Sequence, residues 1–154
     1  MRSRTSGRIA FVVIAVVVFV LDRITKSLVV AQIPYGTEVP VLGRLLGIAN
    51  VHNSGAAFGI LPAGSAFFLV AAIAVSIGLV IYVVRTPGNL GTDIPLGLIL
   101  GGTLGNGYDR IMFGTVTDFV NFHFWPVFNV ADAAISTGVV LLIGGYLLRK
   151  QPTA

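Results

Sequence analysis

The last third of the chain holds two aspartates that could work as a catalytic pair. Asp118 lies in the sequence TDFVNF at 117–122, and Asp132 follows fourteen residues later in FNVAD at 128–132. A turn between them can bring the two carboxyl groups together, and two facing carboxylates do not both ionise readily. One would keep a proton while the other stays a base. Such a pair can activate a water molecule and protonate a leaving amine.

The composition predicts that this pair is held by a membrane protein. The chain has 154 residues, is 55% hydrophobic and only 10% charged, and has a mean hydropathy of +0.92. A soluble all-α protein would show a polar stripe along its helices, and several apolar segments here show none. The net charge of +4 could suggest nucleic-acid binding, but the basic residues cluster at the ends of apolar segments, which is typical of membrane topology. The absence of cysteine excludes disulfides, a thiol nucleophile and a thiolate metal site.

We therefore expect one all-α membrane domain covering residues 1–154, with four transmembrane helices at about 9–31, 66–84, 94–113 and 127–148. Ile9–Leu21 alone would be about 20 Å long as a helix, whereas the hydrocarbon core is about 30 Å thick. The first helix must therefore continue through Asp22 and Lys26. A basic start before an apolar segment also fits a signal peptide. However, there is no small-x-small cleavage site in polar surroundings, and the apolar pattern recurs downstream, which favours a retained helix.

The charged residues of the first helix allow two interpretations. Asp22 and Lys26 are four residues apart, with the acid first, which suits an ion pair on one helix face. Alternatively, both side chains could extend to the nearby membrane interface. The segment after this helix, 32–65, is polar and contains the alternating stretch Glu38–Leu42, which indicates irregular or β-like structure. Asn53 begins NSGAAFG at 53–59, which is either a close-approach motif or an ordinary turn.

Two later motifs also have structural alternatives. In GGTLGNGYDR at 101–110, Asn106, Asp109 and Arg110 fall on one helix face, or else they mark a helix end that reaches water. Asn129 and Asp132 fit a helix N-cap and its first turn equally well, so position alone leaves Asp132 either a cap or a catalytic group. We interpret His123, in an aromatic segment, as an interfacial residue rather than a metal ligand.

The basic residues predict the orientation. One set lies on the side expected to be cytoplasmic: Arg2, Arg4, Arg8, Arg85, Arg149 and Lys150. Both termini would then be cytoplasmic, and a group of polar residues would gather toward the outer leaflet: Asp22, Lys26, Asn53, Asn106, Asp109, Arg110, Asp118, Asn129 and Asp132. A polar cluster there indicates a functional site.

Five motifs in this order resemble the sequence blocks of bacterial lipoprotein signal peptidase, also called signal peptidase II. They are DRITK at 22–26, NSGAAFG at 53–59, GGTLGNGYDR at 101–110, VTDF at 116–119 and FNVAD at 128–132. The connection between the two aspartate blocks is a little shorter here than in many family members. The five motifs extend from Asp22 to Asp132 and so span nearly the whole chain.

This resemblance implies a four-helix aspartic endopeptidase of the bacterial cytoplasmic membrane, with its site toward the outer leaflet and a small β-rich segment and a covering element between helices one and two. It would remove signal peptides from diacylglyceryl-modified prolipoproteins, cutting on the amino side of the lipid-modified cysteine. Asp118 and Asp132 would be catalytic. Asn53, Asn106, Arg110 and Asn129 would line or brace the site, and Asp22, Lys26 and Asp109 would support it.

The resemblance further implies no cofactor or metal, membrane lipids and lipid-modified prolipoproteins as partners, no nucleic acid, a monomer, and binding of globomycin-type inhibitors. Two other classes remain as alternatives from the residues alone. A proton-coupled small transporter would place its carboxylates near the bilayer midplane. A Mg²⁺-dependent lipid phosphatase or transferase would use Asp109, Asp118 and Asp132 as oxygen ligands.

Overall fold

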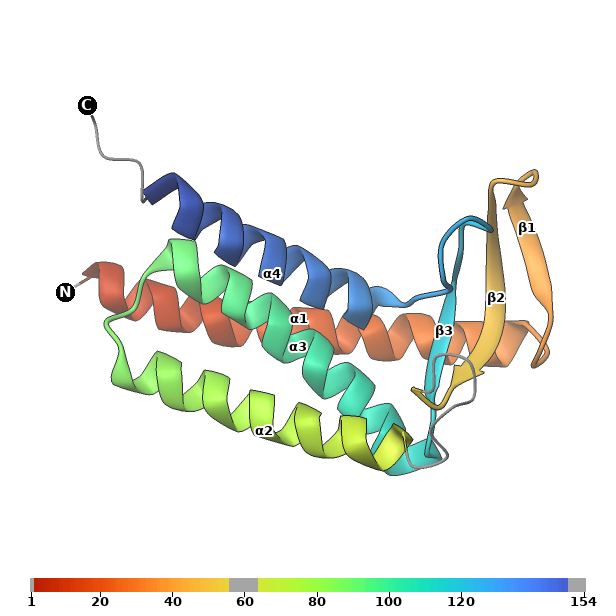
Figure 1. The fold of residues 1–154 in the computed structure, drawn as a ribbon, viewed down its shortest axis with the longest axis horizontal. Coiled ribbons are helices and arrows are strands. Elements are labelled where there is room, and N and C mark those ends of the chain that lie inside the picture. The colour runs from red at the N-terminus through yellow and green to blue at the C-terminus, as the bar shows by residue number, and fades with distance from the viewer. Residues whose placement is uncertain (1, 56–63, 150–154) are drawn as a thin grey trace.

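The computed structural model describes residues 2–55 and 64–149 and contains four long helices and three strands. The helices are α1 (Arg2–Gln32), α2 (Gly64–Arg85), α3 (Leu90–Phe113) and α4 (Val130–Arg149), and the strands are β1 (Glu38–Leu42), β2 (Leu46–Asn53) and β3 (Val116–Asn121). The helices run along the long axis of the molecule, and the sheet lies across one end of the bundle (Figure 1). The first residues of α1 and the last residues of α4 lie at the opposite end (Figure 1).

The sheet brings two of the predicted site residues onto adjacent strands. Its order is β1-β2-β3, and both pairings are antiparallel. Val51 of β2 lies opposite Asp118 of β3, two residues before Asn53. Because side chains alternate along a strand, Val51 and Asn53 point to the same face of the sheet as Asp118. The register therefore places Asn53 diagonally across from Asp118.

Helix α3 is the centre of the bundle and packs against α1, α4 and α2. Glycines make these crossings close. A Cβ on Gly101 would lie 2.6 Å from the Ala15 carbonyl oxygen of α1, and one on Gly102 would collide with the Ala131 carbonyl oxygen of α4. Since these neighbours are backbone atoms, any larger side chain would push the helices apart. This close packing aligns the polar side chains of α1, α3 and α4 at one end of the bundle.

The ends of α3 are defined by its flanking residues. The Asn89 side chain accepts a hydrogen bond from the Gly91 N–H at 2.9 Å, as expected of an N-cap. At the other end Gly114 has a φ of 75°, and its N–H donates to the Arg110 carbonyl at 3.2 Å. A left-handed glycine of this kind ends a helix readily. The chain then turns directly into β3, which carries Asp118.

Several predicted bounds differ from the observed ones. The stretch Glu38–Leu42, expected to be irregular or β-like, forms strand β1. The sheet also includes β3, which lies between α3 and α4, so the β structure is not confined to the connection between the first two helices. Helix α1 begins at Arg2 rather than near residue 9, because nothing in the polar start breaks a helix. Helix α4 begins at Val130 rather than at 127, because Asn129 caps it.

Two of the four helices, α2 and α4, are long and apolar enough by length and composition to cross a membrane. Helices α1 and α3 carry charged residues within their apolar stretches. The covering element expected between α1 and α2, and Ala56–Gly59 of the predicted motif, lie outside the described residues.

Candidate active site

Asn129 connects the two aspartates on which the site is centred. Its side-chain Nδ2 donates to Asp118 Oδ1 at 2.7 Å, and its backbone N–H donates to Asp132 Oδ2 at 3.3 Å. The Asn129 side chain is fully buried, so its position is fixed by its surroundings. Asn129 directly precedes α4, while Asp118 comes from β3. One residue at the start of α4 thus contacts both carboxyl groups.

Asp132 is both a helix cap and a member of this pair. Its N–H donates to Asn129 Oδ1 at 2.9 Å, which together with the reverse bond forms a reciprocal cap at the start of α4. The other carboxylate oxygen, Oδ1, accepts from Asn106 Nδ2 of α3 at 2.7 Å. The two interpretations of Asp132 were therefore not exclusive. Both oxygens of the Asp132 carboxyl thus accept hydrogen bonds, one from the start of α4 and one from α3.

Asp118 is the more deeply buried of the two, with 2% of its surface exposed. Burial and, to a smaller extent, the charge of nearby Asp132 raise the pKa of its carboxyl, which lies at about 6. Hydrogen bonds donated by Asn53 Nδ2, at 2.9 Å, and by Asn129, together with the charge of Lys26, oppose this increase in pKa. The two carboxyl groups therefore differ in environment, which is the condition for sharing one proton.

A buried ionic network lies directly behind this pair. Lys26 Nζ contacts Asp22 Oδ2 and Asp109 Oδ2, each at 2.9 Å, and donates to Asn106 Oδ1 at 2.9 Å. The ammonium group has three donors, and this arrangement gives each an acceptor. Asp22, Lys26 and Asp109 are at most 2% exposed. The predicted ion pair between Asp22 and Lys26 is confirmed, and the alternative that both extend to the interface is wrong.

The network positions elements as well as charges. Asp22 Oδ1 accepts from the backbone N–H of Ala131 at 3.1 Å, in the first turn of α4. Asp109 Oδ2 accepts from the backbone N–H of Thr117 at 3.2 Å, directly before Asp118. One carboxylate thus fixes the helix that carries Asp132, and the other fixes the strand that carries Asp118. The support role predicted for these residues therefore has a geometric basis.

Arg110 differs from the other cations in the site. Its Nη1 donates to the Asn106 carbonyl at 3.3 Å, and its guanidinium lies 5.3 Å from the centre of the Phe68 ring of α2. Within the described residues it forms no ion pair, and its Nε is buried without a hydrogen-bond partner. The charges of Asp132 and Asp118 act on it. Arg110 therefore keeps donor capacity close to the two carboxyl groups.

All nine predicted site residues gather at this end of the bundle. Asn106 and Arg110 face the aspartate pair, whereas Asp109 turns toward α1 and is occupied by Arg23, Lys26 and the Thr117 N–H. Asp109 therefore does not join Asp118 and Asp132 as a third oxygen ligand, as the Mg²⁺ alternative required. His123 pairs with Glu38 at 2.9 Å within the sheet region.

Sequence reasoning missed three contributors to the site: Arg23, Thr117 and Phe68. Arg23 pairs with Asp22 and Asp109, and its guanidinium lies 4.8 Å from the centre of the Tyr108 ring. Its place between Asp22 and Lys26 in DRITK was a signal that could have identified it. Thr117 and Phe68 contribute a backbone group and a ring face, and neither leaves a recognisable pattern in the sequence.

Comparison with known proteins shows the family of this chain. Residues 14–148 match the family described as signal peptidase (SPase) II. The lipoprotein signal peptidase of Halothermothrix orenii is 40% identical over 131 residues, covering 85% of this chain and 90% of that protein. The lipoprotein signal peptidase of Gloeobacter violaceus is 41% identical over 143 residues, covering 90% of this chain and 82% of that protein. A solved bacterial membrane enzyme superposes with a TM-score of 0.83 at 33% identity, covering 92% of this chain and 94% of that one. This chain belongs to the signal peptidase II family.

Proposed function

We propose that the protein is an aspartic endopeptidase that removes signal peptides from prolipoproteins, cutting on the amino side of a diacylglyceryl-modified cysteine. Membership of the signal peptidase II family supports the peptidase activity and the lipoprotein substrate. The observation that supports the aspartic mechanism is the bridge that Asn129 makes between Asp118 and Asp132. Family membership also argues against the transporter alternative.

In the proposed mechanism Asp132 acts as the base and Asp118 holds the proton. Ionised Asp132, stabilised by Asn106 and by the start of α4, takes a proton from a water molecule placed between the pair. Protonated Asp118 polarises the scissile carbonyl while the water oxygen attacks its carbon. The resulting tetrahedral diol breaks down when a proton passes to the leaving amine. Arg110 has unused donors near both carboxyl groups and would stabilise the charge that develops on the carbonyl oxygen.

The remaining proposed roles follow from the contacts. Asn53 and Asn129 orient Asp118, and Asn106 orients Asp132, while Asp22, Lys26 and Asp109 hold the elements behind them. The reaction needs no metal or other cofactor, because the aspartate pair supplies both acid and base. We also propose that the protein acts as a monomer and binds globomycin-type inhibitors at this site.

We further propose that all four helices span the bacterial cytoplasmic membrane within one domain, with both termini cytoplasmic and the site toward the outer leaflet. Large apolar side chains are exposed along each helix, such as Val16 of α1, Val70 of α2, Ile111 of α3 and Val140 of α4. Such exposure suits contact with lipid. The buried network of α1 and α3 would lie near the outer ends of these spans, which allows a lipid-linked substrate to reach the site from the bilayer.

A gel-shift assay tests the proposed function. Purified protein in detergent is mixed with a diacylglyceryl-modified prolipoprotein or with the same prolipoprotein lacking the lipid, each with and without EDTA. We expect cleavage of the lipid-modified form alone, at a rate that EDTA leaves unchanged. Inhibition by EDTA would show that the reaction needs a metal. Equal cleavage of the unmodified form would contradict the proposed substrate.

The proposed proton position predicts a specific pH dependence. The pKa of Asp118 is about 6, so this group loses its proton as the pH rises through 6 and the singly protonated pair disappears. We expect kcat/KM to fall about tenfold per pH unit above this value. Asn53→Ala removes a hydrogen bond to ionised Asp118, which raises the pKa of Asp118 and should move this limb of the profile to higher pH.

Asn121→Ala is a matched control for this experiment. Asn121 lies in the same sheet, but its Nδ2 donates to Glu38 Oε2 at 2.7 Å rather than to Asp118. In Asn121→Ala the decline of kcat/KM at high pH should occur at the same pH as in the parent, even if the absolute rate changes. If the decline of kcat/KM in Asn53→Ala occurs at the parental pH or at a lower pH, another group holds the essential proton.

A further inference from the structure

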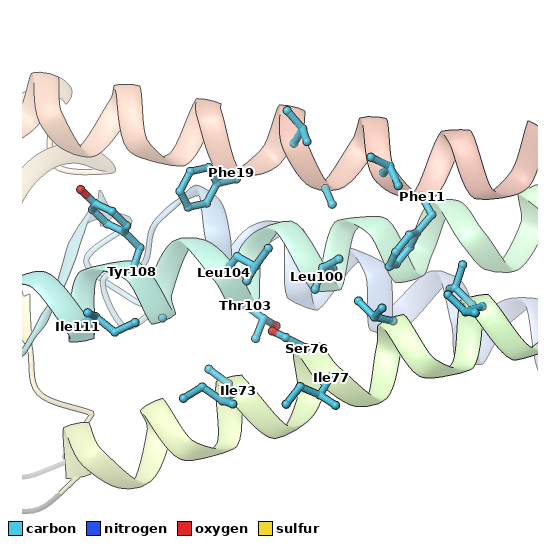
Figure 2. Close-up of a pocket in the computed structure, with 18 of the residues that line it drawn as sticks. Phe11, Phe19, Ile73, Ser76, Ile77, Leu100, Thr103, Leu104, Tyr108 and Ile111 are labelled. Carbon is cyan, nitrogen blue, oxygen red and sulfur yellow. The ribbon is translucent and has the colours of Figure 1, made fainter.

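A long apolar slot separates α1 from α2 on the side of α3 away from the aspartate pair. Its volume is about 840 Å³, and Figure 2 shows side chains of all three helices directed into it. Phe11 and Phe19 come from α1, Leu100 and Leu104 from α3, and Ile73 and Ile77 from α2. Among the described residues that line it, Arg8 at one end is the only charged one.

The slot exists because α2 packs mainly against α3. The described contacts between α2 and α1 are few, and small residues such as Ala72, Ser76 and Gly107 leave the space between the two helices open. At the end near Arg8, Arg8 Nη2 donates to the carbonyl of Val84 in α2 at 2.9 Å and to that of Thr86, directly after α2, at 3.2 Å. These bonds fix the guanidinium at the mouth of the slot.

A second, shallower hollow meets the slot at the same arginine. It has a volume of about 460 Å³ and is lined by Thr5, Arg8, Ile9, Val12 and Val13. Arg8 and Val12 line both hollows. The exposed Arg8 thus borders two hollows, the slot between α1 and α2 and the apolar face of α1 itself. This arrangement matches a lipid that carries two acyl chains on one anionic headgroup.

The dimensions of the slot argue against a peptide helix as its occupant. An α-helix with side chains is about 10 Å wide, so a spanning segment of 18 residues would need roughly 2,000 Å³. The slot offers less than half of this volume. An extended backbone is also excluded at this depth, because its N–H and carbonyl groups would lack partners in an apolar channel. A hydrocarbon chain is narrow enough for the slot, and it has no polar groups that would need hydrogen-bond partners there.

We propose that the slot, together with the hollow that meets it at Arg8, is a binding site for one two-chain anionic phospholipid of the cytoplasmic leaflet. The phosphate pairs with Arg8, one acyl chain fills the slot between α1 and α2, and the other lies along Ile9 and Val13. The leaflet follows from the proposed orientation, in which Arg8 is cytoplasmic. The chain in the slot supplies the packing that α2 lacks on its α1 side. Helix α3 separates this site from the aspartate pair.

Native mass spectrometry of the purified protein in detergent tests the proposal. The probes are dioleoyl phosphatidylglycerol, dioleoyl phosphatidylcholine and the single-chain lysophosphatidylglycerol. We expect one phosphatidylglycerol to be retained about fivefold more tightly than phosphatidylcholine, which is the contribution of one basic side chain near an anionic headgroup. The single-chain lipid should bind at least about tenfold more weakly. Equal retention of all three would overturn the proposal and show adventitious surface lipid only.

Matched variants locate the site. Ser76→Phe places a ring in the slot and should weaken phosphatidylglycerol retention about tenfold, whereas Val75→Phe, on an exposed neighbouring position outside the slot, should not. Arg8→Gln should abolish the preference for phosphatidylglycerol, whereas Arg85→Gln, also an exposed arginine at this end of α2, should keep it. If Arg8→Gln does not fold, the Ser76 and Val75 pair still decides.

Two further results would contradict the proposal. Equal lipid retention by Ser76→Phe and Val75→Phe would show that the slot holds no lipid chain. Loss of prolipoprotein cleavage in Ser76→Phe with unchanged lipid retention would assign the slot to the substrate instead. Lipid retention is measured without turnover, so its outcome is independent of whether the proposed peptidase activity is found.

Discussion

Replacing either Asp118 or Asp132 with Asn should lower kcat for prolipoprotein cleavage by at least about 10³-fold. An amide cannot take a proton from water at neutral pH, and it cannot share a proton with the remaining carboxylate. Because the two groups act as a unit, the double variant should be little worse than either single variant. The measurement is single-turnover cleavage of a diacylglyceryl-modified prolipoprotein in detergent.

Asp132 also caps α4, so loss of activity in Asp132→Asn must be separated from loss of stability. The chain provides a matched control at the opposite end of the bundle. Asp93 is a buried carboxylate in the first turn of α3 whose Oδ2 accepts from the backbone N–H of Asn89, the N-cap residue, at 2.8 Å. Asp93→Asn thus alters a similar cap without touching the aspartate pair. It should lower the unfolding temperature about as much as Asp132→Asn while leaving kcat within about threefold of the parent.

Two outcomes would refute the catalytic assignment. Cleavage at the parental rate by either Asn variant would remove that residue from the mechanism, and Asp132 would then be a helix cap alone. If Asp93→Asn lost as much activity as Asp132→Asn at a similar unfolding temperature, the effect of Asp132→Asn would be explained by folding. Loss in Asp118→Asn would still need explanation, because Asp118 lies in a strand and caps no helix.

The sequence predicts much of this architecture because its signals are local. Four apolar segments correspond to four helices, and the spacing of Asp22 and Lys26 predicted their ion pair, because residues four apart share a helix face. The alternation at Glu38–Leu42 indicated β1 for the same kind of reason. The resemblance to the family located the polar residues of the site.

What the sequence could not predict depends on long-range contacts. The pairing of Val51 with Asp118 joins segments more than sixty residues apart, and no local pattern in 114–127 distinguished a strand from an aromatic interfacial loop. Likewise, helical spacing places Asn106, Asp109 and Arg110 near one another on α3 but does not predict which group each side chain contacts. The Asp109 carboxylate pairs with the cations of α1, whereas the Arg110 guanidinium lies against the Phe68 ring of α2. These contacts depend on neighbouring helices, which local spacing does not reveal.

The buried ionic network should contribute strongly to stability through Lys26. Lys26→Met leaves Arg23 as the only ion-pair partner of Asp22 and Asp109 among the described residues. Arg23 lies at the edge of the cluster, with 18% of its side chain exposed. Removing one partner from a buried ionic group costs about 3–5 kcal/mol, because the remaining charge is neither solvated nor compensated. We expect a loss of this size in the free energy of unfolding, measured by denaturation in detergent.

The cause can be separated from lost packing by restoring charge balance. In the described cluster, two cations face two carboxylates, so Lys26→Met leaves one excess negative charge. The double variant Asp22→Asn/Lys26→Met removes that excess, and the amide oxygen introduced at position 22 can still accept from the Ala131 N–H. It should therefore be more stable than Lys26→Met alone, although it has lost more native contacts. Arg23→Met, which affects the more exposed cation, should lose less stability than Lys26→Met. A double variant less stable than Lys26→Met would show that the individual contacts of Asp22, rather than charge balance, stabilise the cluster.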